Sequence, residues 1–160
     1  MRRLGPFFAA IAGLWIAGAL QQSCSRALSI GPASPDFLII LIAAASPLMS
    51  RTGAAFLGFG AGVVQGALPG ANLMHYVISR TVAAFFTAWA QDLKLAPHSG
   101  TIFLTGVFTT VLAQILFMFL AAPPGIIAYL GATIASAIYN GLLCVPLHGG
   151  LRRALKTEYR

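Results

Sequence analysis

Residues 101–121 read TIFLTGVFTTVLAQILFMFLA and contain no Asp, Glu, Lys or Arg. A helix needs about 20 mainly apolar residues to cross the hydrocarbon core of a bilayer, so this stretch is long enough. The whole chain agrees with it: of 160 residues, 58% are hydrophobic and 8% are charged, whereas soluble domains carry about 25% charged residues. The composition excludes an ordinary soluble enzyme, a disordered tail and a secreted disulfide scaffold, and it indicates an integral membrane protein.

Pro, Gly and polar residues divide the chain into six apolar stretches. The predicted fold is all-α, a single polytopic transmembrane helical bundle of about six spans over residues 1–160. The second and third stretches are shorter than a straight span; they are either short spans or one bent pair surrounded by protein. The expected spans are residues 4–21, 36–49, 54–68, 73–91, 101–121 and 126–147, followed by a basic cytoplasmic tail at 148–160.

The net charge of +7 is best explained by membrane topology. Basic residues cluster at the ends of apolar stretches, at Arg2 and Arg3 and again at Arg152 and Arg153. Such clusters mark cytoplasmic segments, so we expect a multi-pass protein with both termini in the cytoplasm. No basic stripe with interleaved aromatic residues is present, so we expect no nucleic-acid partner.

Small residues repeat along two of the expected helices. Gly58, Gly62 and Gly66 recur every fourth position and therefore share one helix face. Ser136 and Asn140 continue a similar row on the last helix. Such faces let another backbone approach closely, so they are candidates either for packing inside the bundle or for binding a partner helix.

Polar residues within the apolar stretches are the second set of candidates. Arg80 lies near the middle of the fourth stretch, where a charge is costly and marks a functional-site candidate. We expect no carboxylate at its depth, and therefore partners such as Gln114, His75 or Asn140. Asp36 is expected to cap the second helix, with pairing to Arg26 or an external partner as the alternative. Residues Asp36, Gln65, His75 and Arg80 are candidates to line an outward-facing polar pocket.

Catalytic and metal-binding patterns are absent from the sequence. It contains no Walker loop, no HExxH and no GxSxG. Its three acidic residues, Asp36, Asp92 and Glu158, stand far apart in the chain. We therefore expect no enzymatic activity, no metal and no cofactor.

Three motifs in order resemble the MreD family of bacterial rod shape-determining membrane proteins. A Pro-Asp pair opens the second span at residues 35–38, and a Gly-rich span follows from Gly58 to the turn at residues 69–70. The last span carries YNGLLCVP at residues 139–146 before Arg152 and Arg153. The family commonly places an Asp after the Gly-rich stretch, and this chain has Gln65 there.

The resemblance implies a non-enzymatic scaffold of the bacterial inner membrane. It would bind the membrane helix of MreC within the cell-elongation machinery, which maintains rod shape and lateral peptidoglycan synthesis. The RodA/penicillin-binding-protein synthase and, indirectly, MreB would be further partners, as would membrane lipid and a second copy of the chain. The family fold is also thought similar to the substrate-binding subunit of energy-coupling-factor transporters, so a small-solute-binding or transport subunit is the alternative.

Overall fold

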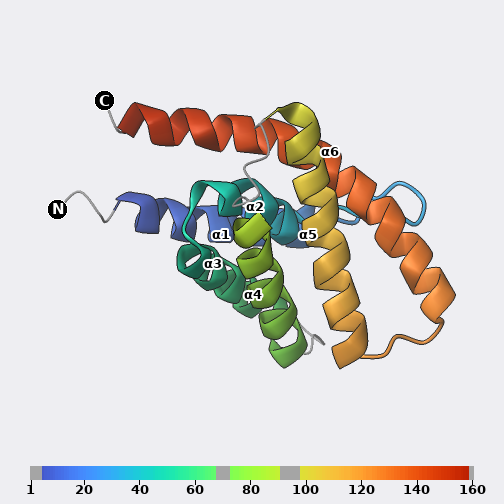
Figure 1. Cartoon of the computed structure of the whole chain (residues 1–160). Helices are drawn as coiled ribbons and strands as arrows, with labels where there is room; N and C mark the ends of the chain where they lie inside the picture. The colour runs from blue at the N-terminus through green and yellow to red at the C-terminus, as the bar shows by residue number, and fades with distance from the viewer. Residues whose placement is uncertain (1–4, 68–72, 91–97, 159–160) are drawn as a thin grey trace.

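The structure is a computed structural model that describes residues 5–67, 73–90 and 98–158, without the side chains of 5–8 and 155–158. Helices make up nearly all of the regular structure in these ranges, and the prediction of an all-α fold is confirmed (Figure 1). An isolated β-bridge joins Ile30 to Ala33. The helices are α1 (Gly5–Ser23), α2 (Phe37–Ala45), a 3-10 turn η1 (Ser46–Leu48), α3 (Arg51–Gly66), α4 (Leu73–Ala90), α5 (Ser99–Leu120) and α6 (Ile126–Glu158).

Two of the described helices are long and apolar enough to cross a membrane. They are Ser99–Leu120 and the part of α6 from Ile126 to Ala154, while Phe37–Leu48 is apolar but shorter. At about 1.5 Å per residue, the nine residues of α2 extend about 14 Å, less than half of a hydrocarbon core of about 30 Å. The structure therefore agrees with the expectation that the second stretch is short.

Helix α2 lies at the centre of the molecule. All seven of its residues from Leu38 to Ala44 are buried, and it packs against each of the other five α-helices. A helix that is apolar on every side is stable only when other elements surround it. This position brings the N-terminal end of α2 into the interior, which determines the site described below.

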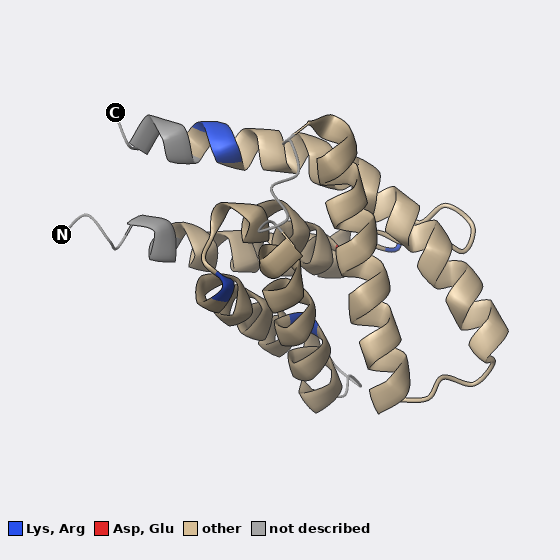
Figure 2. Cartoon of the chain, viewed as in Figure 1, with Lys and Arg blue, Asp and Glu red and all other residues tan. Residues whose placement is uncertain are grey.

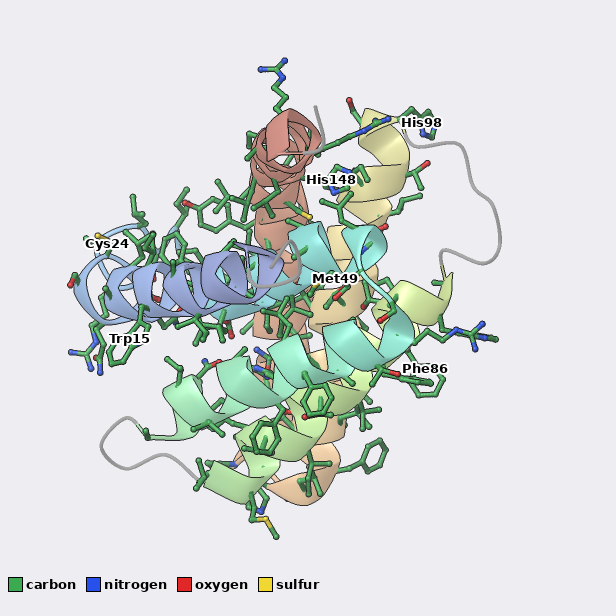
Figure 3. The ribbon with its side chains drawn as sticks, turned by 90° about the vertical axis from the view of Figure 1, so that its left-hand side faces the viewer. Trp15, Cys24, Met49, Phe86, His98 and His148 are labelled. Carbon is green, nitrogen blue, oxygen red and sulfur yellow. The ribbon has the colours of Figure 1, made fainter. Side chains whose placement is uncertain are left out.

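Close backbone contacts hold the outer helices together. Helices α5 and α6 meet where a Cβ on Gly106 would lie 2.7 Å from the Cα of Gly141. Helices α3 and α4 meet along the glycines of α3, since a Cβ on Gly62 would lie 2.5 Å from the Cα of Val77. Larger residues at these positions would push the helices apart. Several large aromatic residues face away from the bundle, as Trp15 and Phe86 do (Figure 3).

Two helix ends differ from the predicted ones. Helix α3 begins at Arg51, three residues before the expected start, because the Ser50 side chain accepts a hydrogen bond from the Gly53 backbone nitrogen and caps the helix. Helix α6 continues to Glu158, so the described part of the predicted tail at 148–160 is helical. Pro146 lies inside α6, and the helix changes direction along its length (Figure 1). A proline removes one backbone hydrogen bond and bends a helix without ending it here.

Candidate functional site: a buried polar cluster

Four polar side chains from four elements meet in the interior. Asp36 precedes α2, Gln65 lies on α3, Arg80 on α4 and Asn140 on α6. All four are at least nine-tenths buried, and Arg80 and Asn140 are each only 1% exposed. We call these four residues the polar cluster.

An ion pair forms the centre of the polar cluster. Arg80 Nη2 lies 2.7 Å from Asp36 Oδ2. The expectation that no carboxylate lies at the depth of Arg80 was therefore wrong, as was the alternative pairing of Asp36 with Arg26. Asp36 reaches this depth because the N-terminal end of the short, buried α2 lies inside the bundle. A buried charge is tolerated when it is paired and hydrogen-bonded.

Gln65 bridges the two charges. Its Oε1 accepts hydrogen bonds from Arg80 Nε at 3.2 Å and from Nη2 at 3.0 Å. Its Nε2 donates to Asp36 Oδ2 at 3.2 Å. One amide therefore serves the cation with its oxygen and the anion with its nitrogen, which a carboxylate at this position could not do.

Asp36 also caps α2, as the sequence predicted. Its Oδ1 accepts a hydrogen bond from the Ile39 backbone nitrogen at 3.0 Å, which satisfies one of the free N–H groups of the first turn. The Asp36 backbone nitrogen donates to Asn140 Oδ1 at 3.1 Å. Asn140 Nδ2 in turn donates to Thr110 Oγ1 at 3.3 Å, which connects α5 to the polar cluster.

Two more hydrogen bonds, one from α6 and one from α1, fix the backbone around the start of α2. Ser136 Oγ on α6 accepts a hydrogen bond from the Ser34 backbone nitrogen at 3.0 Å. Gln21 Oε1 on α1 accepts one from the Phe37 backbone nitrogen at 2.8 Å. With the bonds of the polar cluster, side chains from α1, α3, α4 and α6 all hold the entry to α2.

Of the four candidates for an outward polar pocket, three are hydrogen-bonded to one another, and His75 is not part of this network. Asp36, Gln65 and Arg80 come together, but their polar atoms bond to one another inside the bundle. Among the described residues, His75 Nδ1 is buried without a hydrogen-bond partner, and its ring meets Phe117 edge-on at 6.2 Å.

The polar residues near Arg80 take separate roles. The Tyr76 ring lies 5.1 Å from Arg80 Cζ, within cation–π distance. Gln114, another partner expected for Arg80, instead accepts a hydrogen bond from the Tyr129 hydroxyl at 2.7 Å. Arg80 is therefore held mainly by Asp36 and Gln65.

Both expected partner-helix faces are occupied within the chain. The face of Gly58, Gly62 and Gly66 receives α4, and a Cβ on Gly58 would collide with the backbone oxygen of Arg80. Ser136 and Asn140 point inward to the entry of α2. The small-residue spacing thus lets α3 pack against α4, which sets Gln65 beside Arg80. Of the two alternatives left open by the sequence, these glycines follow the one of packing inside the bundle.

The Arg80–Asp36 pair is the feature that sequence reasoning missed. These two residues are 44 positions apart, and no local pattern connects them. The available signal was their scarcity: within the six expected spans, Arg80 is the one Lys or Arg and Asp36 is the one Asp or Glu. Two isolated opposite charges in an apolar bundle are expected to find each other.

An apolar groove lies apart from the polar cluster. It has a volume of about 490 Å³ and is bordered by α1, α2 and α6. Among the described residues, no group of three His, Cys, Asp or Glu side chains is placed to hold a metal ion. No protein-family model, curated protein or solved structure matches the chain.

Proposed function

We propose that this protein is a non-enzymatic membrane scaffold of the bacterial cell-elongation machinery that binds the single membrane helix of MreC. In this proposal all six helices are embedded in the inner membrane, both termini are cytoplasmic, and the bundle is a rigid support for the partner. The proposal draws on the three motifs that resemble the MreD family and on the closed polar cluster.

The observation that carries the proposal is that the hydrogen bonds of the buried Arg80–Asp36 pair join helices of this chain to one another. Arg80, Asp36, Gln65 and Asn140 bond mainly to one another and to the backbone at the start of α2. Their hydrogen bonds connect α2, α3, α4 and α6. Such a network fixes one arrangement of helices, which is what a protein needs to present a constant surface to a partner helix.

The outward face of α6 is the best candidate for that surface. Gly131 lies on it, and a Cβ at Gly131 would meet nothing within 4 Å. A glycine inside a helix lowers stability by roughly 1 kcal/mol relative to alanine, and nothing within the chain packs closely against this one. We define the outer stripe of α6 as its exposed residues at helical spacing: Ile127, Gly131, Ile134, Ile138 and Leu142.

The outer stripe has the chemistry that helix association in lipid requires. Its residues recur at intervals of three and four, so they share one face, opposite the face that carries Ser136 and Asn140. Packing in lipid depends on close approach rather than on hydrophobic burial, and a glycine among isoleucines allows such an approach.

Copurification tests the proposal. The tagged protein is expressed with MreC, extracted in mild detergent, and the eluate is identified by protein and lipid mass spectrometry. We expect near-stoichiometric MreC with the wild-type chain, a loss of at least tenfold with Gly131→Leu, and no loss with Gly150→Leu. Gly150 is the matched control because it is also an exposed glycine of α6 with open space around it.

Three results would contradict parts of the proposal. Absence of MreC from the wild-type eluate would remove the scaffold function. A copurifying vitamin-sized molecule or an energy-coupling subunit in its place would favour the alternative of a small-solute-binding transport subunit. An equal loss with Gly131→Leu and Gly150→Leu would exclude the outer stripe of α6 as the binding surface.

A further inference from the structure

We infer that the part of α6 after Pro146 lies along the membrane surface and binds anionic phospholipids, with acyl chains in the apolar groove beneath it. We name residues 147–158 the C-terminal segment of α6. The inference rests on the membrane location proposed above, but it does not depend on MreC.

The length of α6 provides the first argument. Its 33 residues extend about 50 Å, whereas the hydrocarbon core is about 30 Å thick. Counted from Ile126, Pro146 falls about 30 Å along the helix. A span that starts at Ile126 therefore reaches the far side of the hydrocarbon core close to the proline, where the helix can bend.

The direction of the C-terminal segment provides the second argument. Helix α5, one of the two long apolar helices, runs from top to bottom in both Figure 1 and Figure 3. The last part of α6 runs across it in Figure 1 and is seen end-on in Figure 3. If α5 crosses the bilayer, the C-terminal segment lies across the bilayer normal.

The two faces of the segment differ in polarity, which is the pattern of an interfacial helix. Leu147 and Leu151 are four residues apart and line the apolar groove. Arg152 and Arg153 follow at about 100° and 200° around the helix from Leu151, and both are exposed. Figure 2 shows this cationic turn near the end of α6, far along the chain from the other described cations.

The groove and the arginines together specify the occupant. The groove is lined by Ala, Gly, Ile, Leu and Phe side chains of α1, α2 and α6, so it suits a hydrocarbon chain. Arg152 and Arg153 complement a phosphate, which guanidinium groups bind with two parallel hydrogen bonds. An anionic phospholipid carries both parts in one molecule, and basic residues beside a membrane helix are attracted to such lipids.

His148 holds the segment in its place. Its Nδ1 lies 2.8 Å from the backbone oxygen of Ala44 on α2, and Figure 3 shows its ring inside the bundle beneath α6. The segment is therefore attached to the central helix one turn before Arg152. This attachment fixes the arginines relative to the bundle, so the lipid site is a constant feature of the fold.

Native mass spectrometry of the purified full chain in detergent tests the inference. The protein is titrated with phosphatidylglycerol or with phosphatidylcholine of the same acyl composition, and the fraction with bound lipid is measured. We expect preferential binding of phosphatidylglycerol and a loss of about fivefold in its apparent affinity for each arginine replaced. Arg152→Gln and the double variant R152Q/R153Q measure this loss, and R152K/R153K, which keeps both charges, should retain most of the preference.

Arg26→Gln is the matched control, because Arg26 is also exposed but lies in the segment between α1 and α2. It should leave the preference unchanged. Melting temperatures establish that each variant is folded. If R152Q/R153Q does not fold, the lipid preference of Arg152→Gln alone tests the inference.

Equal binding of the two lipids by the wild-type chain would overturn the inference, as would a preference that survives in folded Arg152→Gln and R152Q/R153Q. Full competition by free glycerol phosphate would also overturn it, because the acyl chain would then contribute nothing. Lipid preference in a chain that fails to bind MreC would leave this inference standing while removing the proposed partner.

Discussion

Replacing Asp36 by Asn tests the polar cluster at its centre. The change keeps the size of the side chain and the cap of α2, since Asn is also a good N-cap residue. It removes the negative charge 2.7 Å from Arg80 Nη2, and leaves a cation that is 1% exposed opposite a neutral amide. Removing one partner of a buried ion pair costs about 3–5 kcal/mol.

The assay is thermal unfolding of the purified protein in detergent. A change of 1 kcal/mol shifts the melting temperature by about 2–4 °C for chains of roughly this size, so Asp36→Asn should lower it by about 6–20 °C. Arg26→Gln, which removes a charge from an exposed side chain between α1 and α2, is the control and should leave the melting temperature nearly unchanged.

A double-mutant cycle separates the pair from its surroundings. Arg80→Met should also be strongly destabilising, because Asp36 then stays buried without its cation. Asp36→Asn combined with Arg80→Met should lose less than the sum of the single losses, by about 1–3 kcal/mol. A melting temperature of Asp36→Asn within about 2 °C of wild type, or strictly additive losses, would refute the argument that this ion pair holds the bundle together.

Three further substitutions test the packing around the cluster. Gly62→Leu should prevent α3 from meeting α4 and sharply reduce the yield of folded protein, measured as the monodisperse fraction in size-exclusion chromatography; a normal profile would contradict the close contact. Asn140→Ala should cost about 1–3 kcal/mol because the Asp36 backbone nitrogen loses its partner, and a thermal melt unchanged from wild type would contradict this. Thr87→Val should cost only about 0.6 kcal/mol, although it removes the 2.8 Å hydrogen bond to Thr109 between α4 and α5; a loss as large as that of Asn140→Ala would show that this second polar contact is equally important.

Local sequence patterns predicted the helices well because the signals that define them are local. Apolar stretches separated by Pro and Gly gave the number and order of helices, and Asp36, the first residue of the second stretch, was correctly identified as the cap of its helix. The end of α6 was harder to predict. The last span was expected to end at residue 147 and to be followed by a tail, but tertiary contacts such as His148 with Ala44 hold the next turns of the helix in place.

The polar cluster could be predicted only in part, because the depth of each residue depends on packing. Asp36 follows a loop, and no carboxylate was expected at the depth of Arg80. The structure buries it because α2 is apolar all round and lies at the centre. The glycine spacing on α3 correctly indicated close helix contact, but spacing alone does not distinguish a helix of the same chain from a partner's. The role of Gln65, which departs from the family pattern, could not be predicted from the sequence, because it depends on the positions of both Arg80 and Asp36.

Photo-crosslinking in living cells tests the central claim most directly. A photoreactive amino acid is placed at Ile134 on the outer stripe of α6, or at Phe59, which is also exposed but lies on α3. The scaffold account predicts a crosslink to MreC from position 134 and none from position 59. A crosslink from position 59 alone, or no MreC crosslink from either position in cells that express both proteins, would contradict it.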